Sequence, residues 1–403
     1  MNRPPNKLWQ QLAIATNWPV LVAVGVLSTL GIVSIWSDSP ADGAKQLVFL
    51  SVAIGCMALF QVVDYRSIGR LAPAFYLFSL GLVLYTVFGK VAEKLHHPLP
   101  FVHTIKGACN WINFGAASLQ PAELMKVAFV MLLARYLRFR SNYRTFRGLL
   151  PPFALALIPV GFILMQPDLG TALIFVPALF VMLYAAGAKL KQLLLIVLLG
   201  ASLAPLAWWT GVDENGKPHS GLPLMRYLPE MVKTYQRQRV YALFNDDPRT
   251  LEYTGFQQRH ALIAYGSGGI SGKGWGNVVV GRHVPEAHND MVYALIGEQF
   301  GFFGSTVVLG AYLILFTAGI EIAGSTREPF GRLVALGVVA MLAAQTFLNL
   351  MVAVKMLPVT GVTLPFISYG GSSLVASFMS AGLLLNIGQN RPIVMANDAF
   401  EFD

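Results

Sequence analysis

Ten mostly apolar runs alternate with short polar segments along the chain. They lie near residues 18–36, 46–63, 72–89, 121–137, 152–166, 170–186, 191–209, 291–320, 332–354 and 369–388. A helix of about 20 apolar residues can cross the hydrocarbon core of a bilayer. The pattern therefore predicts an all-α polytopic membrane protein with about ten transmembrane helices. The fifth and sixth runs are short and are separated only by QPDLG.

The composition supports a membrane protein rather than a soluble one. Hydrophobic residues make up 55% of the chain and charged residues 12%, whereas soluble domains contain about 25% charged residues. We interpret residues 1–403 as one integral membrane domain, in which 210–290 form a large extracytoplasmic loop between the seventh and eighth helices. The first apolar run lacks an A-x-A-like cleavage site after it, so we expect a retained helix. Cys56 and Cys109 suggest neither a disulfide framework nor a metal site.

The basic residues predict the orientation. With both termini in the cytoplasm, the inner segments hold 14 Lys and Arg residues and the short outer segments hold five, as the positive-inside rule requires. The nine basic residues of 210–290 do not count, because long loops cross the membrane largely regardless of charge. The net charge of +9 does not indicate nucleic acid, since these residues lie between hydrophobic runs.

This orientation places the unusual polar stretches on the outer side. They are GACNWINFGAASLQPAEL, QPDLG, YQRQRV, GSGGISGKGWGN, PEAHND and LPFISYGGSS, and all seven histidines lie outside as well. The inner segments are short and basic, and we expect no comparable feature there. Any chemistry should therefore take place at the outer face.

Three ionisable residues in or beside the predicted spans each allow two interpretations. Glu123 and Lys126 lie three residues apart on one helix face; they either form an ion pair that joins helices or line a polar cavity near the outer surface. Asp168, between Pro167 and Gly170 in QPDLG, either caps the next helix or belongs to the same cavity.

Asp290 and Glu298 stand where the eighth apolar run begins. Asp290 precedes the run, and Glu298 follows two helical turns later on roughly the same face. Asp290 either caps the helix or acts as a catalytic base at the membrane surface, and spacing alone does not separate these alternatives. His288 is interpreted as a loop residue, because His288 and Asp290 alone are too sparse for a metal site.

The long loop also supplies cations beside these acids. Arg237, Arg239 and Lys273 are the residues that a phosphate-bearing substrate would need, while a carboxylate removes a proton. GSGGISGKGWG is not a nucleotide-binding P-loop, because Gly274 follows Lys273 where Ser or Thr is required. We interpret it as a flexible loop or tight turn, and YGGSS as a site of close helix packing.

Taken together and in order, these motifs resemble the SEDS proteins (shape, elongation, division and sporulation; the RodA, FtsW and SpoVE type) over nearly the whole chain. YQRQRV and GKGW resemble the RodA-like elongation branch more than the division branch. The resemblance implies a ten-span peptidoglycan glycosyltransferase of the bacterial inner membrane. Such a protein polymerises lipid II on the outer face, beside a class B penicillin-binding protein that crosslinks the product.

The resemblance also implies roles for particular residues. The acid considered essential in the family falls on Asp290, the tryptophan of the first motif on Trp111, and the acid and lysine of the second on Glu123 and Lys126. Three positions depart from the family pattern: Asn110 replaces a usual Arg, Ala122 a Ser and Asn289 a Thr. The missing arginine removes a phosphate contact that Lys106 could supply instead.

The mechanism expected from this resemblance needs one base. Asp290 would deprotonate the 4-hydroxyl of the acceptor lipid II, and pyrophosphate would leave from the inverted anomeric carbon, in contrast to the two carboxylates of glycoside hydrolysis. Mg²⁺ or Mn²⁺ at the pyrophosphate fits this chemistry, although the sequence contains no recognisable ligand set. The alternatives are a lipid II flippase, which would need polar features on both faces, and a non-catalytic scaffold for a penicillin-binding protein.

Overall fold

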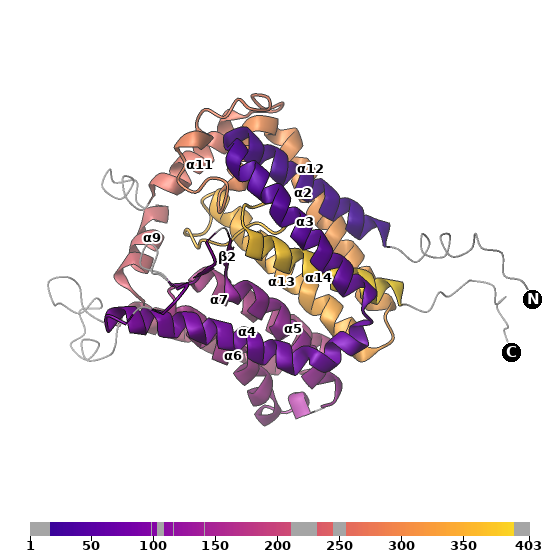
Figure 1. Cartoon of the computed structure of the whole chain (residues 1–403). Coiled ribbons are helices and arrows are strands. Elements are labelled where there is room, and N and C mark those ends of the chain that lie inside the picture. The colour runs from indigo at the N-terminus through magenta and orange to yellow at the C-terminus, as the bar shows by residue number, and fades with distance from the viewer. Residues whose placement is uncertain are drawn as a thin grey trace, which may run out of the picture.

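The computed structural model describes residues 17–97, 99–102, 109–115, 117–140, 142–210, 232–244 and 255–390. Within these ranges each predicted span corresponds to one long helix (Figure 1). The helices are α2 (Trp18–Asp38), α3 (Pro40–Val62), α4 (Tyr65–Lys94), α5 (Pro121–Arg138), α6 (Leu150–Met165), α7 (Leu169–Ala186), α8 (Leu190–Trp208), α12 (Val292–Ser325), α13 (Pro329–Ala353) and α14 (Gly371–Gln389).

By length and composition, nine helices of the described residues could cross a membrane. The tenth long helix, α5, carries Glu123, Lys126, Arg135 and Arg138. It lies inside the bundle and packs against α4, α13, α7 and α14. An amphiphilic helix can occupy this place because its neighbours, rather than lipid, surround its charges. The chain is therefore a multi-pass, all-α membrane protein, as predicted.

The helices pack around a central pair, α13 and α14 (Figure 1). α14 runs along α3, and α13 runs along α7 and α5. α2 packs against α12 on one side of the pair, and α4 packs against α5 on the other. α8 makes few contacts beyond its neighbour α7 and has Leu193 as its buried residue.

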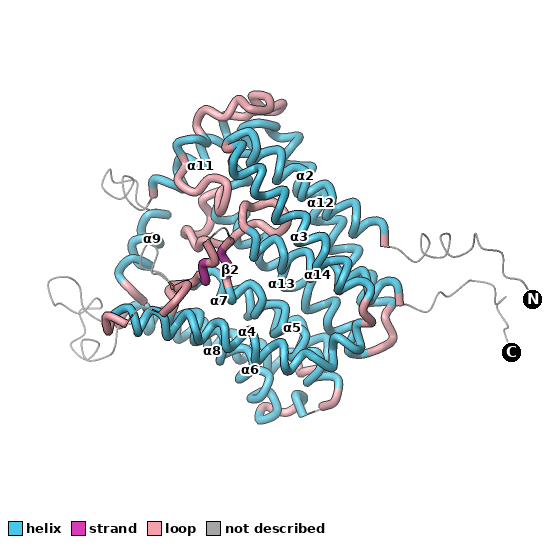
Figure 2. Tube along the Cα trace, in the orientation of Figure 1, coloured by secondary structure: helices cyan, strands magenta, loops and turns pink. Residues whose placement is uncertain are grey.

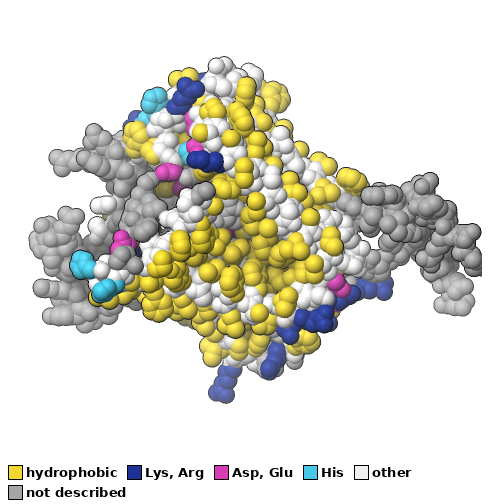
Figure 3. All heavy atoms as spheres, viewed as in Figure 1, with side chains coloured by type: hydrophobic (Ala, Val, Ile, Leu, Met, Phe, Trp, Pro, Cys, Tyr) yellow, Lys and Arg dark blue, Asp and Glu magenta, His cyan; other side chains and the backbone are white. Residues whose placement is uncertain are grey.

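Apolar side chains cover much of the outer surface of the bundle (Figure 3). Large hydrophobic residues are exposed along α3, α4, α8 and α12, including Val62 at 83% and Leu198 and Leu71 at 66%. Water would disfavour such a surface, whereas the acyl chains of a bilayer match it. The same side chains that would destabilise a soluble protein thus place this bundle in lipid.

Polar residues fix where several helices begin. Asp64, Asp168 and Glu328 accept hydrogen bonds from the backbone N–H groups of Arg66, Thr171 and Gly331 at the starts of α4, α7 and α13. These side chains satisfy donors that have no partner within the helix. The cap interpretation of Asp168 is confirmed.

The region predicted as the large loop contains regular structure in its described part (Figure 2). Helices α9 (Thr234–Phe244) and α11 (Phe256–Ser267) and the 3₁₀ helix η4 (Gly281–His283) lie within it. Before α5, β1 (Ile112–Asn113) and β2 (Ser118–Leu119) form a short antiparallel hairpin that pairs Ile112 with Leu119. Arg3, Lys7, Lys106 and Arg391 lie outside the described residues.

Candidate active site

A cavity of about 520 Å³ lies where several polar motifs meet at one end of the bundle. Its walls come from α3, the hairpin before α5, the turn before α7, α9, the turn before α12, and residues 360–371 before and at the start of α14. Four of the predicted site residues line it: Trp111, Asp168, Arg239 and Asp290. Segments up to 326 residues apart in the chain, from Lys45 to Gly371, thus supply one polar chamber.

Asp290 is half-buried in the turn that leads into α12. Asn349 Nδ2 donates hydrogen bonds to the backbone oxygens of Asp290 (2.8 Å) and Val362 (2.6 Å), which ties this turn to α13 and to the opposite wall of the cavity. The residue at the N-cap of α12 is Met291, and no side chain forms a cap bond there. The N-cap interpretation of Asp290 is therefore wrong, and its carboxyl group contributes to the cavity instead.

Asp168 combines a cap with a position in the cavity wall. Its Oδ1 accepts a hydrogen bond from the Thr171 N–H (3.0 Å), and its Oδ2 accepts from Thr171 Oγ1 (2.8 Å) and Gln120 Nε2 (3.1 Å). Burial raises the pKa of this carboxyl group, against the effect of these hydrogen bonds. With its oxygens already engaged, Asp168 is suited to holding the wall in place and less suited to accepting a substrate proton.

Within the described part of the chain, two cations line the cavity. Arg239 was predicted as a site residue; its Nη1 donates to the Val359 oxygen (2.8 Å), which links α9 to the segment after α13. Lys45, a basic residue of an outer segment, lines the cavity although its position in the sequence does not predict this. Its side chain is 61% exposed, and its Nζ lies 3.3 Å from Asp42 Oδ1. The ion pair of Lys45 is largely exposed, and both cations line the same chamber as Asp290.

The hairpin before α5 forms a further wall. Trp111, Asn113 and Ser118 line the cavity, as does Gln120 directly before α5. The N–H of Gln120 donates to Ser372 Oγ (2.9 Å), and that hydroxyl donates to the Ser118 oxygen (3.0 Å). YGGSS, interpreted from sequence as a packing motif, therefore also anchors the wall that carries Trp111.

Asn110, at the position where an arginine was expected, also lines the cavity. Its Oδ1 is buried and has no hydrogen-bond partner among the described residues. This atom accepts hydrogen bonds and carries no positive charge, so it does not replace an arginine as a phosphate contact. Lys45 and Arg239 are the described cations that could do so.

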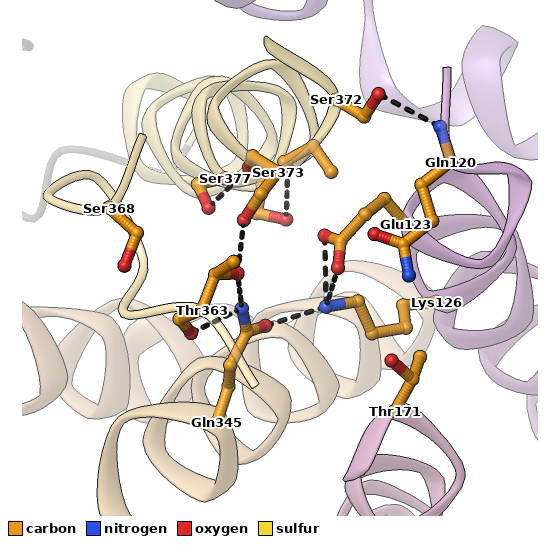
Figure 4. A network of polar contacts seen from close by, with 12 residues as sticks. Gln120, Glu123, Lys126, Thr171, Gln345, Thr363, Ser368, Ser372, Ser373 and Ser377 are labelled. Carbon is orange, nitrogen blue, oxygen red and sulfur yellow. Dashed lines mark hydrogen bonds and ion pairs between the residues drawn. The ribbon is translucent and has the colours of Figure 1, made fainter. Parts of the chain in front are cut away.

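Glu123 and Lys126 are not among the residues that line the cavity. Figure 4 shows them in a network of polar contacts with Gln345 and Thr363. Lys126 Nζ is 3.0 Å from both carboxylate oxygens of Glu123 and donates to Gln345 Oε1 (2.7 Å). Gln345 Nε2 in turn donates to Thr363 Oγ1 (3.1 Å), and Thr363 is a lining residue. The pair is almost fully buried, with 2% and 5% of the two side chains exposed. It joins α5 to α13 and supports the cavity floor.

Glu298 and Lys273 lie outside the cavity lining, contrary to prediction. Glu298 is fully buried: Oε1 accepts from the N–H groups of Val279 (3.0 Å) and Val280 (2.9 Å) and from Lys273 Nζ (2.6 Å), and Oε2 accepts from the N–H of Gly281 (2.7 Å). Through these hydrogen bonds, Glu298 and Lys273 hold the glycine-rich loop against α12. Contact with substrate would require these bonds to break.

The glycine-rich loop is therefore packed in place rather than an isolated flexible turn. Gly272 has φ +78°, and a Cβ there would lie 2.1 Å from the Gln299 oxygen, so no larger residue fits. Lys273 N–H donates to the Glu298 oxygen (2.9 Å), and Phe302 N–H donates to the Gly269 oxygen (2.9 Å). These bonds flank Gly301, where α12 is broken by a φ of +62°.

Arg237 also lies outside the cavity lining. It is 3% exposed, its Nε and Nη2 donate to the oxygens of Val232 (2.9 Å) and Thr210 (2.7 Å), and its guanidinium lies 5.7 Å from the ring centre of Trp208. It joins the end of α8 to the start of α9. A buried guanidinium of this kind positions α9, from which Arg239 reaches the cavity.

A metal ion held by the protein alone would need a set of ligands. Among the described residues no three His, Cys, Asp or Glu side chains cluster in this way. The carboxyl groups in the cavity are those of Asp168 and Asp290. Mg²⁺ commonly binds through one or two carboxylates together with substrate phosphates and water, and this residue set fits such a shared ion.

Comparison with known proteins agrees with the resemblance that the sequence motifs indicate. The model of the FtsW, RodA and SpoVE family, described as cell cycle protein, matches residues 8–392. Stage V sporulation protein E of Bacillus subtilis is 31% identical over 92% of this chain and 94% of its own length. The probable peptidoglycan glycosyltransferase FtsW of Geobacter sulfurreducens is also 31% identical, over 91% of this chain and 94% of its own.

Solved structures show a similar fold. One chain, from a study of how a peptidoglycan synthase complex coordinates polymerization and crosslinking, has a TM-score of 0.74 and 29% identity over 93% of this chain and 98% of its own. The rod shape determining protein RodA of Thermus thermophilus has a TM-score of 0.65 and 28% identity over 93% and 97%. Since SpoVE, FtsW and RodA relatives are about equally similar, the RodA-like branch stays a prediction.

Proposed function

Because this chain belongs to the FtsW, RodA and SpoVE family of cell cycle proteins, we propose that it is a peptidoglycan glycosyltransferase that polymerises lipid II into glycan strands. The observation that carries the proposal is the cavity, in which the Asp290 carboxyl group shares one chamber with Arg239, Lys45 and Trp111. A base beside cations suits a sugar donor whose leaving group is a pyrophosphate.

In the proposed reaction, Asp290 acts as the base, and Arg239 and Lys45 stabilise the leaving group. Asp290 takes the proton from the 4-hydroxyl of the acceptor lipid II, and that oxygen bonds to the anomeric carbon of the growing chain. The bond from this carbon to the pyrophosphate oxygen breaks with inversion, which gives a β-1,4 link. Arg239 and Lys45 balance the charge of the departing pyrophosphate, so no general acid is needed.

A divalent cation would share this last task. Mg²⁺ or Mn²⁺ bound to the pyrophosphate, with Asp290 or Asp168 as its protein ligand, would neutralise charge on the leaving group. Trp111 offers a flat apolar face to a sugar ring at the cavity wall. The polyprenyl tail stays in the surrounding lipid, which explains why the reacting groups belong at the end of a helix bundle.

The family and the relatives' names support a proposal for the biological setting. We place the protein in the bacterial inner membrane with both termini in the cytoplasm and the cavity on the outer face, acting in cell-wall elongation and rod shape. Its partner would be a class B penicillin-binding protein, since a similar solved chain comes from a complex of polymerization and crosslinking. That partner would crosslink the strands made here.

Purified protein, alone and with its penicillin-binding partner, should convert lipid II into glycan strands that lysozyme can digest. A flippase would move lipid II between the leaflets of vesicles without making strands, and a scaffold would do neither. The absence of strands under conditions in which a known lipid II polymerase works would contradict the proposal.

Topology can be tested separately. Reporter fusions after Lys189 and Arg391 should indicate the cytoplasm, and a cysteine introduced at Gly216 should react with an impermeant reagent from outside. Labelling at residue 189 from outside would reverse the orientation and place the cavity on the wrong side for lipid II polymerisation.

A further inference from the structure

A second polar pocket lies at the other end of the bundle from the cavity. Its volume is about 470 Å³, and four arginines line it: Arg66 and Arg70 at the start of α4, and Arg135 and Arg138 at the end of α5. The short, basic inner segments predict no such feature, and this prediction is wrong. The arginines are close because α4 and α5 pack antiparallel, so that the first turns of one meet the last turns of the other.

The length of helix α5 gives the approximate distance between the cavity and the arginine pocket. It begins beside Gln120, which lines the cavity, and its last residue, Arg138, lines the arginine pocket. Its 18 residues span about 27 Å at 1.5 Å per residue. This is close to the thickness of the hydrocarbon core, about 30 Å. The arginine pocket therefore lies at the opposite membrane surface from the cavity.

Among the described residues, the charges around the arginine pocket leave an excess of two positive charges, because two acids face four arginines. The acids that face it are Asp64, 3.9 Å from Arg66, and Glu328, which lies 3.1 Å from Arg138. Arg70 donates to Ser67 Oγ (2.9 Å) and Arg135 to the Gly69 oxygen (2.9 Å), and both of these partners are neutral. Four guanidinium groups against two carboxylates attract an anion, and guanidinium geometry suits phosphate in particular.

Apolar residues adjoin the arginines. Phe139 and Phe330 belong to the pocket lining, and Phe139 is 66% exposed. Val62 and Leu71, just before and within the first part of α4, are 83% and 66% exposed. Phosphate held by the arginines would thus stand next to a surface that acyl chains cover. A free phosphate ion makes no use of this apolar rim, whereas a phospholipid uses both parts.

We propose that the arginine pocket binds the phosphate headgroup of an anionic phospholipid in the leaflet opposite the cavity. The headgroup lies among Arg66, Arg70, Arg135 and Arg138, and the acyl chains lie against Phe139 and the exposed side of α4. Basic pockets between membrane helices recognise lipid headgroups in this way. The site is independent of lipid II polymerisation and tests separately from it.

Native mass spectrometry of the purified full chain, titrated with phosphatidylglycerol, tests the proposal. Arg66→Gln/Arg70→Gln removes two exposed arginines and leaves the bonds of Arg135 and Arg138 intact. It should weaken binding about thirtyfold, because each arginine that contacts the headgroup should contribute about a fivefold effect. The matched control is Arg147→Gln, an exposed arginine at the same end of the bundle and outside the lining; it should bind like the parent.

A second variant makes the arginine pocket more positive instead of less positive. Asp64→Asn keeps the cap of α4, because Asn caps as well as Asp, and removes one acid from the pocket. It should bind phosphatidylglycerol about fivefold more tightly. This variant keeps the test decisive if the double arginine variant folds poorly.

Three results would overturn the proposal. Equal weakening by Arg147→Gln would indicate diffuse attraction to the whole basic surface. Equal binding of zwitterionic phosphatidylcholine would show that the arginines do not select the headgroup. Binding of water-soluble glycerol 3-phosphate as tight as that of phosphatidylglycerol would identify a free phosphate site rather than a lipid site.

Discussion

Asp290 and Glu298 are two acids eight residues apart in one motif, and the fold gives them opposite surroundings. Asp290 is half-buried in the turn before α12 and lines the cavity. Glu298 is fully buried within α12, where three backbone N–H groups and Lys273 occupy its oxygens. Their spacing along the chain predicts that both lie on roughly the same helix face.

The difference shows how to distinguish a reacting carboxyl group from a structural one. A base has to reach the substrate and change its proton during each cycle. A fully buried carboxylate with paired oxygens holds its charge and its neighbours in place, and removing it leaves donors unsatisfied. By this criterion Glu123 also belongs with Glu298, since it is buried against Lys126. The following changes test this division, in order of expected effect.

Asp290→Asn should reduce lipid II polymerisation by about 10²–10⁴-fold, the usual effect of losing a general base. Asn keeps the size of the side chain and the backbone bond to Asn349, so the melting temperature should stay within error of the parent. The matched control is Glu286→Gln, which changes an exposed acid of the same turn. Near-parent polymerisation by Asp290→Asn would exclude Asp290 as the base.

Lys126→Ala should destabilise the protein by about 3–5 kcal/mol, because it leaves the buried Glu123 without its partner. The folded yield in detergent and the unfolding temperature measure this effect. Glu123→Gln/Lys126→Met removes both charges and should recover folding better than activity, since the link through Gln345 to the cavity floor is still lost. A folded and fully active Lys126→Ala would show that the pair supports neither the fold nor the site.

Glu298→Gln should cost about 1.5–3 kcal/mol of stability, since hydrogen bonds to a charged group contribute about this much. The rate of polymerisation per folded molecule should remain near that of the parent. The measurement pairs a thermal unfolding curve with the assay normalised to folded protein. A hundredfold slower rate with unchanged stability would place Glu298 in the reaction and remove the distinction from Asp290.

His288→Gln should have the smallest effect, and the effect should depend on pH. The Asp38 carboxylate, whose Oδ2 lies 3.7 Å from His288 Nδ1, raises the pKa of His288 above its usual value of 6.5, against the effect of burial. Asp42 and Glu286 raise the pKa as well. Protonated His288 therefore stabilises the fold below pH 6.5, and this contribution is lost as pH rises through the raised pKa.

The expected size is below about 1 kcal/mol, as for other partly exposed pairs. Melting temperatures of parent and variant should differ at pH 6 and converge by pH 9. Asp38→Asn should abolish the same difference, because it removes the charge that raises the pKa. A difference that persists unchanged at high pH would show that the ring matters by packing against Tyr369.

The sequence by itself determined the architecture. Most of the apolar runs contain about 20 residues, the length that a helix needs to cross a bilayer, and every predicted span corresponds to a helix. It also identified the motifs whose residues meet in the cavity, among them Trp111, Asp168, Arg239 and Asp290. These motifs were recognisable because polar residues beside long apolar runs are rare.

The tertiary structure decided which polar residues face the cavity and which are committed to each other. Glu298 meets Val279–Gly281 through a loop that folds back, Lys126 meets a glutamine 219 residues away, and Arg237 is fixed by the oxygen of Thr210. Contacts between distant segments also place Lys45 in the cavity lining and bring the four arginines together in one pocket. The partner of a polar side chain depends on contacts between distant segments, and neither spacing nor hydropathy along the chain contains those contacts.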